Sequence, residues 1–129
     1  PKTKAASKSI STPVEVDAID ECLIIIPKKV FSTNQFSIIG PTWHLYGTDY
    51  ALQMKLINSP VLVFPSELWH VSDGKSLNLN YFDAIQWLLK KYSKNYSVIY
   101  TFFGVWPSNP ILLKFKCLYR KLRFYIKGV

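Results

Sequence analysis

Apolar positions recur at helical spacing in several parts of this chain. The clearest pattern covers residues 79–94 and predicts a helix. Large apolar side chains return there every three or four positions, at Tyr81, Ile85, Leu88 and Tyr92. A similar spacing predicts a helix over residues 49–58. Asn109 followed by Pro110 is typical of a helix start, because the Asn side chain can cap free N–H groups and proline is tolerated at the first helical position.

Short aliphatic runs bounded by prolines or turn residues predict strands. We expect buried strands over residues 23–26 and 61–64, and further strands over residues 14–17, 68–71 and 96–103. Pro27 suits the first turn of a short helix over residues 28–31, and residues 32–48 have the composition of a loop. This order of strands and helices predicts an α/β or an α+β fold, and we expect the α/β class. We expect three parts: a flexible arm (1–13), a domain (14–106) and a C-terminal helix (107–129).

Charge is distributed very unevenly along the chain. Residues 1–83 carry seven lysines and eight acids, whereas residues 84–129 carry nine basic residues and no acid. A net charge of +9 in the last third implies a polyanionic partner, either membrane headgroups or nucleic acid. The two cysteines, Cys22 and Cys117, have no metal or redox spacing, which favours a reducing, cytoplasmic location. No apolar run approaches the roughly 20 residues that a membrane span needs.

The C-terminal segment predicts an amphipathic helix with basic edges. Its apolar stripe is Ile111, Phe115, Leu118, Leu122 and Tyr125. Basic residues flank this stripe on both sides: Lys114, Lys116, Arg120, Lys121, Arg123 and Lys127. Such a helix is typical of one that lies on an anionic membrane, with the apolar side chains at the acyl boundary and the lysines reaching the phosphates. The alternative is a helix that packs on its own domain and exposes a solvated basic face.

Two segments together resemble the second half of bacterial family-two glycosyltransferases of the GT-A fold. The first is residues 17–31, DAIDECLIIIPKKVF, and the second is residues 43–53, WHLYGTDYALQ. An apolar run and then residues 69–76, WHVSDGKS, follow in the order that this family shows, and a helix ending in Lys-Lys-Tyr comes next. The resemblance implies a partial GT-A-like mixed sheet with flanking helices, and an enzyme that transfers a sugar from a nucleotide-sugar donor to a saccharide or lipid-linked acceptor.

The resemblance also implies roles for individual residues. Asp49, at a predicted helix start, is the candidate base that takes the proton from the attacking hydroxyl. Aromatic rings stack on the C–H faces of sugars, so the loop before Asp49 is the candidate acceptor site, through Trp43, His44 and Tyr46. The simpler interpretations are an ordinary first-turn or capping role for Asp49 and core packing for the aromatic residues.

Residues 70–76 are the candidate contact with the donor. His70 resembles a histidine that helps to hold a divalent cation, Mn²⁺ or Mg²⁺, or the diphosphate. Lys75 and Ser76, in a glycine-containing turn, offer an ammonium group and backbone N–H groups to phosphate. The simpler interpretations are a half-buried histidine and a plain surface turn.

The chain departs from the family in one important respect. It lacks the nucleotide-binding βαβ half and the Asp-x-Asp motif, and Glu15-Val16-Asp17 matches only the spacing of that motif. We therefore expect another part of the natural protein or a partner chain to supply the nucleotide site. Two other functions stay open at this stage. One is a non-catalytic basic module that binds nucleic acid or anionic membrane, with nucleic acid the less favoured ligand. The other is a structural protein that dimerises through the C-terminal helix.

Overall fold

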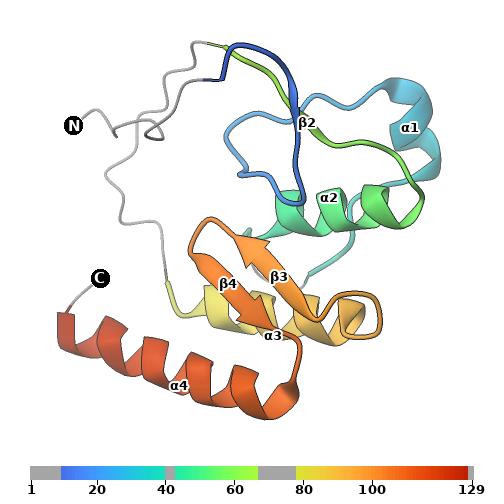
Figure 1. Ribbon diagram of the computed structural model, residues 1–129. Coiled ribbons are helices and arrows are strands. Elements are labelled where there is room, and N and C mark those ends of the chain that lie inside the picture. Colours follow the sequence, from blue (N-terminus) through green and yellow to red (C-terminus); the bar gives the residue numbers. More distant parts are fainter. Residues whose placement is uncertain (1–9, 40–42, 67–77, 128–129) are drawn as a thin grey trace.

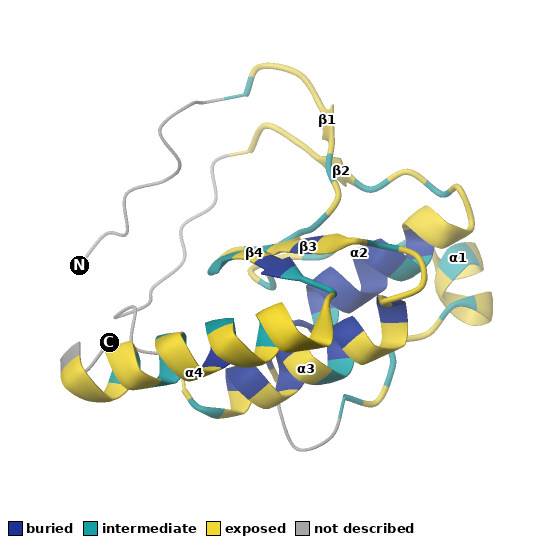
Figure 2. Ribbon diagram, turned by 60° about the horizontal axis from the view of Figure 1, so that its bottom comes forward, coloured by how far each residue is buried: buried dark blue, intermediate teal, exposed yellow. Residues whose placement is uncertain are grey.

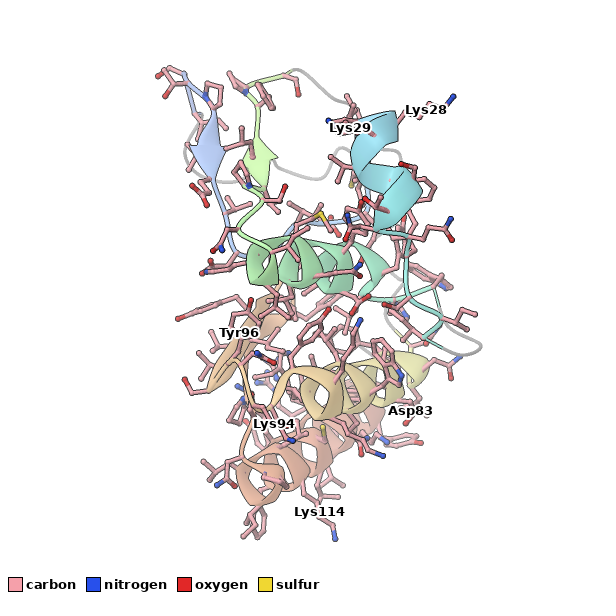
Figure 3. All side chains as sticks on the ribbon, turned by 90° about the vertical axis from the view of Figure 1, so that its right-hand side faces the viewer. Lys28, Lys29, Asp83, Lys94, Tyr96 and Lys114 are labelled. Carbon is pink, nitrogen blue, oxygen red and sulfur yellow. The ribbon has the colours of Figure 1, made fainter. Side chains whose placement is uncertain are left out.

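The computed structural model describes residues 10–39, 43–66 and 78–127. Within these residues it contains four helices and two separate two-stranded antiparallel sheets. In chain order the elements are β1 (Val14–Glu15), α1 (Lys28–Thr33), α2 (Tyr46–Leu56), β2 (Leu62–Val63), α3 (Asn80–Tyr92), β3 (Val98–Thr101), β4 (Gly104–Pro107) and α4 (Pro110–Lys127). Figures 1 and 3 show them stacked, with the β1–β2 pair and α1 at one end, α2 next, then α3 with the β3–β4 hairpin, and α4 at the other end.

Helix α3 supplies most of the core. It spans Asn80–Tyr92, close to the predicted range of 79–94, and its predicted stripe is confirmed as buried. The most enclosed side chains of the stripe are Ile85 and Leu88, each 0% exposed. Figure 2 shows the buried face of α3 turned toward α2 and the hairpin. The core therefore lies along the buried face of α3, where side chains of α2, the hairpin and α4 pack against it.

The β3–β4 hairpin replaces a single predicted strand. Residues 96–103 were expected to be one extended segment, but the chain turns after Thr101 and pairs Ile99 with Trp106. Gly104 permits this turn because its φ of 122° lies in a region that other residues rarely adopt. The Thr101 hydroxyl oxygen fixes the hairpin to α3, because it lies 2.8 Å from the Tyr81 hydroxyl and 3.3 Å from the Trp106 indole nitrogen that donates to it.

The start of α4 follows the predicted capping pattern. The Asn109 Oδ1 atom accepts hydrogen bonds from the backbone N–H groups of Ile111 and Leu112, at 3.0 and 3.1 Å. Pro110 occupies the first helical position. The helix runs for 18 residues. Among the helices that the structure describes, none combines the length and apolarity needed to cross a membrane.

Three of the expected strands need correction or cannot be placed. The buried strand expected at residues 23–26 is wrong: Leu23 and Ile25 are 56% and 85% exposed, and these residues take no strand conformation. The strand expected at 61–64 shortens to β2, which pairs with β1. The strand expected at 68–71 lies outside the described residues. A mixture of helices and strands is confirmed, but the strands that the structure describes form antiparallel pairs and no larger mixed sheet.

We predict that truncation of Leu88 lowers stability far more than truncation of a similar leucine on α4. Leu88→Ala leaves a cavity in the core and should lower the free energy of unfolding by about 2–5 kcal/mol. Leu118 is 57% exposed, so Leu118→Ala should cost less than about 1 kcal/mol. Urea denaturation of both variants measures the difference. Equal losses would contradict the central position of α3.

Candidate functional site

A groove of about 400 Å³ lies between the β3–β4 hairpin and residues 16–20. We call residues 16–21, which contain Asp17, Asp20 and Glu21, the acidic segment. One wall is residues 16–20 and the other is Tyr100, Thr101 and Phe102. The aromatic side chains of this second wall are open to solvent, with Tyr100 52% and Phe102 76% exposed. The groove therefore offers two accessible rings opposite the carboxylates of Asp17 and Asp20.

A smaller space, the hollow, adjoins the groove. It shares Ile19, Asp20 and Phe102 with the groove. Its volume is about 20 Å³, room for about one water molecule. The other side chains around it continue the two walls or come from the start of α2 and from α3: Glu21, His44, Leu45, Thr48, Tyr81 and Phe103. The hollow thus brings a carboxylate and an imidazole together at one end of the groove.

Hydrogen bonds hold the acidic segment against the start of α2. The Gly47 N–H donates to Glu21 Oε1 at 3.3 Å, and the Tyr46 hydroxyl donates to the Glu21 carbonyl oxygen at 3.4 Å. The Thr48 hydroxyl donates to the Ile19 carbonyl oxygen, also at 3.4 Å. A Cβ atom at Gly47 would lie 3.2 Å from Ile24 Cδ1 and 3.3 Å from Glu21 Cγ, so both side chains would have to shift by a few tenths of an ångström. The close approach therefore favours glycine at this position.

Glu21 has an altered proton affinity. Partial burial and the neighbouring charge of Asp20 raise the pKa of the Glu21 carboxyl to about 7. The Gly47 N–H opposes this shift because it stabilises the ionised form. At neutral pH the carboxyl is thus present in both the charged and the protonated state. Such a group can accept a proton and release it again near pH 7.

His44 lies beside Glu21 in the hollow and is 4% exposed. Its Nε2 atom is 3.2 Å from Asn78 Oδ1, and because an amide oxygen only accepts, this contact selects the tautomer with the proton on Nε2. Burial lowers the pKa of His44, and the bond to Asn78 partly opposes that effect. Trp43 lies against the imidazole at 4.1 Å between ring centroids and is 53% exposed. Of the three predicted acceptor residues, His44 lines the hollow, Tyr46 bonds to the segment beside it, and Trp43 presents an open ring.

Asp49 does not face a cleft, contrary to expectation. Its carboxylate is 0% exposed and borders neither the groove nor the hollow. Oδ1 accepts hydrogen bonds from the Lys91 ammonium at 2.7 Å and the Tyr92 hydroxyl at 2.9 Å. Oδ2 is buried and has no hydrogen-bond partner among the residues that the structure describes. Because α2 begins at Tyr46 rather than Asp49, Asp49 lies in the first turn of the helix as its fourth residue, and its carboxylate bonds to α3.

The predicted donor contacts His70, Lys75 and Ser76 lie outside the described residues. In the parts of the chain that the structure does describe, no group of three or more His, Cys, Asp or Glu side chains could hold a metal ion. The described residues therefore do not form a site for the divalent cation that the resemblance implies. Binding of Mn²⁺ or Mg²⁺ through His70 stays a prediction.

Several of the predicted membrane-binding residues contact their own domain instead. The Lys116 ammonium donates to the Val105 carbonyl oxygen and lies over the Trp106 ring. The Arg120 guanidinium donates to the Phe103 carbonyl oxygen at 3.2 Å. The Lys121 ammonium is 4.0 Å from the Asp83 carboxylate. These three side chains help to hold α4 on the hairpin and α3, and the side chain of Lys127 is outside the described part.

Part of this site has little signal in the sequence. Glu21 was not singled out, although three acids within five residues, Asp17, Asp20 and Glu21, were a visible signal. Tyr100 and Phe102 carried no local signal, because only the hairpin turn after Thr101 brings them opposite the acidic segment.

We predict that Lys91 is needed to keep the buried Asp49 carboxylate stable. Lys91→Met removes the charge partner of Asp49 and should lower the free energy of unfolding by about 2–3 kcal/mol. This loss is smaller than for a fully buried pair because the Lys91 side chain is 32% exposed. Adding Asp49→Asn should recover part of that loss, since a neutral amide costs less to bury. Urea denaturation of both single variants and of the double variant measures the coupling. Lys90→Met is the control, and an equal loss there would argue against the pair.

We predict that Glu21 makes stability fall as pH rises. Its folded pKa of about 7 exceeds the ordinary value of 4.5, so the folded state holds the proton more tightly between these values. Stability should therefore drop between about pH 4.5 and 7, by about 1–2 kcal/mol after allowance for solvent screening. Glu21→Gln should remove this dependence, and Glu15→Gln, at an exposed glutamate, should keep it. Urea denaturation at pH 5 and pH 8 provides the test, and parallel pH profiles for wild type and Glu21→Gln would contradict it.

Comparison of this chain with protein-family models, with curated proteins and with solved structures gives no match. A proposal about function therefore rests on the contacts described above and on the two segments that carry the family resemblance, residues 17–31 and 43–53.

Proposed function

We propose that this chain is the acceptor-side part of a glycosyltransferase that uses a nucleotide-sugar donor and a saccharide or lipid-linked acceptor. One observation carries the proposal. The two segments that resemble family-two glycosyltransferases of the GT-A fold, residues 17–31 and 43–53, contact each other through three hydrogen bonds and line the same hollow. These bonds join residues 25 to 29 positions apart, so folding brings together the parts of the sequence that carry the resemblance.

The chemistry of the groove suits a sugar. Its volume of about 400 Å³ falls within the usual range for small-molecule sites. Tyr100 and Phe102 offer exposed rings to the C–H faces of a pyranose, and Asp20 offers carboxylate oxygens to its hydroxyl groups. Asp17, on the same wall, is paired with the Lys55 ammonium. The groove therefore combines apolar faces with hydrogen-bond acceptors.

Glu21 is better placed than Asp49 to serve as the base. In the proposed reaction the acceptor hydroxyl oxygen bonds to the anomeric carbon of the donor, and the bond from that carbon to the diphosphate oxygen breaks. The hydroxyl proton passes to Glu21, whose pKa of about 7 suits proton transfer at neutral pH. Asp49 is enclosed between Lys91 and Tyr92, so we assign it a positioning role: it fixes α2, whose first turn bonds to Glu21.

The nucleotide of the donor needs a site that these residues do not supply. The Asp-x-Asp motif is missing, so we propose that another part of the natural protein or a partner chain binds the nucleotide. We propose that the divalent cation implied by the family resemblance is bound together with the nucleotide.

A nucleic-acid-binding module is the weaker candidate. Lys116, Arg120 and Lys121 are engaged with their own domain, which leaves fewer cations for phosphates. Tyr92 and Trp106 are 2% and 1% exposed, so neither ring can stack on a base, although Tyr100, Tyr119 and Tyr125 are exposed.

We predict that the chain binds saccharides in the groove. Saturation-transfer NMR against a panel of mono- and disaccharides should identify at least one ligand. Phe102→Ala and Asp20→Asn should each weaken its binding about tenfold, the equivalent of about 1.4 kcal/mol for one lost stacking or charged contact. Tyr119→Ala removes an aromatic ring on α4 that is also more than half exposed, and it should leave binding unchanged. A folded chain that binds no saccharide, or binding that neither groove variant weakens, would overturn the proposal.

A further inference from the structure

Helix α4 has two faces of different character. One face, which we call the inner face, is formed by Leu113, Cys117, Arg120 and Phe124, spaced as one row along the helix. Cys117 is 6% exposed, and the other three are partly covered by the domain. Contacts from Arg120 on this face, and from Lys116 and Lys121 beside it, join α4 to the hairpin and α3, and the apolar side chains on the opposite side of α4 take no part in them.

The opposite side, the outer face, is apolar and open to solvent. It contains the whole apolar stripe that the sequence predicted, and every member is more than half exposed: Ile111, Phe115, Leu118, Leu122 and Tyr125. Leu112, Tyr119 and Ile126 widen it and are 58%, 58% and 80% exposed. Figure 2 shows α4 as mostly exposed along its length. A continuous apolar surface of this kind marks an interaction site in proteins.

Cations border the outer face on both sides. With 100° between successive helical residues, Lys114 and Lys121 fall along one edge, and Lys116 and Arg123 fall along the other. Figure 3 shows the Lys114 side chain extending from α4 away from the rest of the domain. The Arg123 guanidinium lies 5.9 Å from the centre of the Tyr119 ring, and so stays beside the outer face. No acidic residue occurs anywhere in Pro110–Lys127.

We infer that the outer face of α4 lies on an anionic lipid bilayer, parallel to its surface. The apolar side chains enter the acyl boundary, and Lys114 and Arg123 meet the lipid phosphates. An 18-residue helix is about 27 Å long, enough for one continuous contact in the membrane plane. This inference does not depend on the proposed glycosyl transfer.

Charge favours a bilayer over a second copy of the chain. If two copies paired through their outer faces, the cationic edges of both helices would meet without any acid on α4 to compensate. Anionic headgroups supply the opposite charge along both edges at once. Lys116, Arg120 and Lys121 hold α4 on the domain. Among the predicted lipid contacts whose side chains the structure describes, Lys114 and Arg123 are the two cations left facing outward.

The test is co-sedimentation of the 129-residue chain with vesicles. Phosphatidylcholine vesicles that contain phosphatidylglycerol should bind it at least tenfold more tightly than pure phosphatidylcholine. Leu118→Asp with Leu122→Asp places two anions on the outer face and should reduce binding more than tenfold. Both positions are over half exposed, so the melting temperature should change little. Ile25→Asp is the matched control, because Ile25 is an aliphatic residue that is 85% exposed elsewhere, and it should leave binding intact.

Lys114→Glu with Arg123→Glu tests the charged edges separately and should abolish the preference for anionic vesicles. Equal binding to both vesicle types, or binding that survives the Leu118 and Leu122 changes, would overturn the inference. So would a dimer in analytical ultracentrifugation that the leucine changes dissociate while vesicles capture none of the protein, since the outer face would then be an interface between copies.

Discussion

The buried carboxylate of Asp49 is the constraint on which the arrangement of the helices depends. An ionised group with no exposure is very costly unless charge and hydrogen bonds compensate it. Lys91 and Tyr92 at the end of α3 provide that compensation, and both bond to the same oxygen atom. Tyr92 also donates to the Asp49 carbonyl oxygen at 3.1 Å. The angle and register between α2 and α3 are therefore fixed by polar geometry as well as by apolar packing.

The position of the candidate site depends on this contact between α2 and α3. Because α2 is held on α3, its first turn presents the Gly47 N–H and the Tyr46 and Thr48 hydroxyls to the acidic segment. The other wall comes from the hairpin, which Thr101 ties to Tyr81 of α3. Helix α3 thus positions both walls of the groove, one through α2 and the other through the hairpin. The pKa of Glu21 is raised to about 7 because partial burial and the adjacent Asp20 both disfavour its ionised form.

Helix α4 combines two roles for its basic residues. Lys116 and Arg120 use backbone carbonyl oxygens of the hairpin as acceptors, and Lys116 and Lys121 also lie over the rings of Trp106 and Phe82. These contacts attach the helix while its large apolar side chains stay outside. A helix whose apolar stripe drove folding would have buried that stripe. In this protein, α4 is attached to the domain by the inner face around Cys117 and by cationic side chains. The broader apolar outer face remains exposed to solvent.

The sequence by itself determined the features that depend on neighbours along the chain. The range of α3, the Asn109 cap, the Pro110 start and the stripe of α4 all follow from spacing and local hydrogen bonds, and the structure agrees with them. The strand expected at residues 23–26 fails because an apolar run becomes a strand only when another strand pairs with it, and residues 23–26 pair with none of the strands that the structure describes. The hairpin turn, the enclosure of Asp49, the pKa of Glu21 and the choice of which α4 face is covered were decided by tertiary structure. The enclosure of Asp49 and the choice of the covered α4 face depend on groups more than ten positions away. The hairpin and the pKa of Glu21 also involve nearer residues, but neither the pairing in the hairpin nor the burial of Glu21 shows in local periodicity.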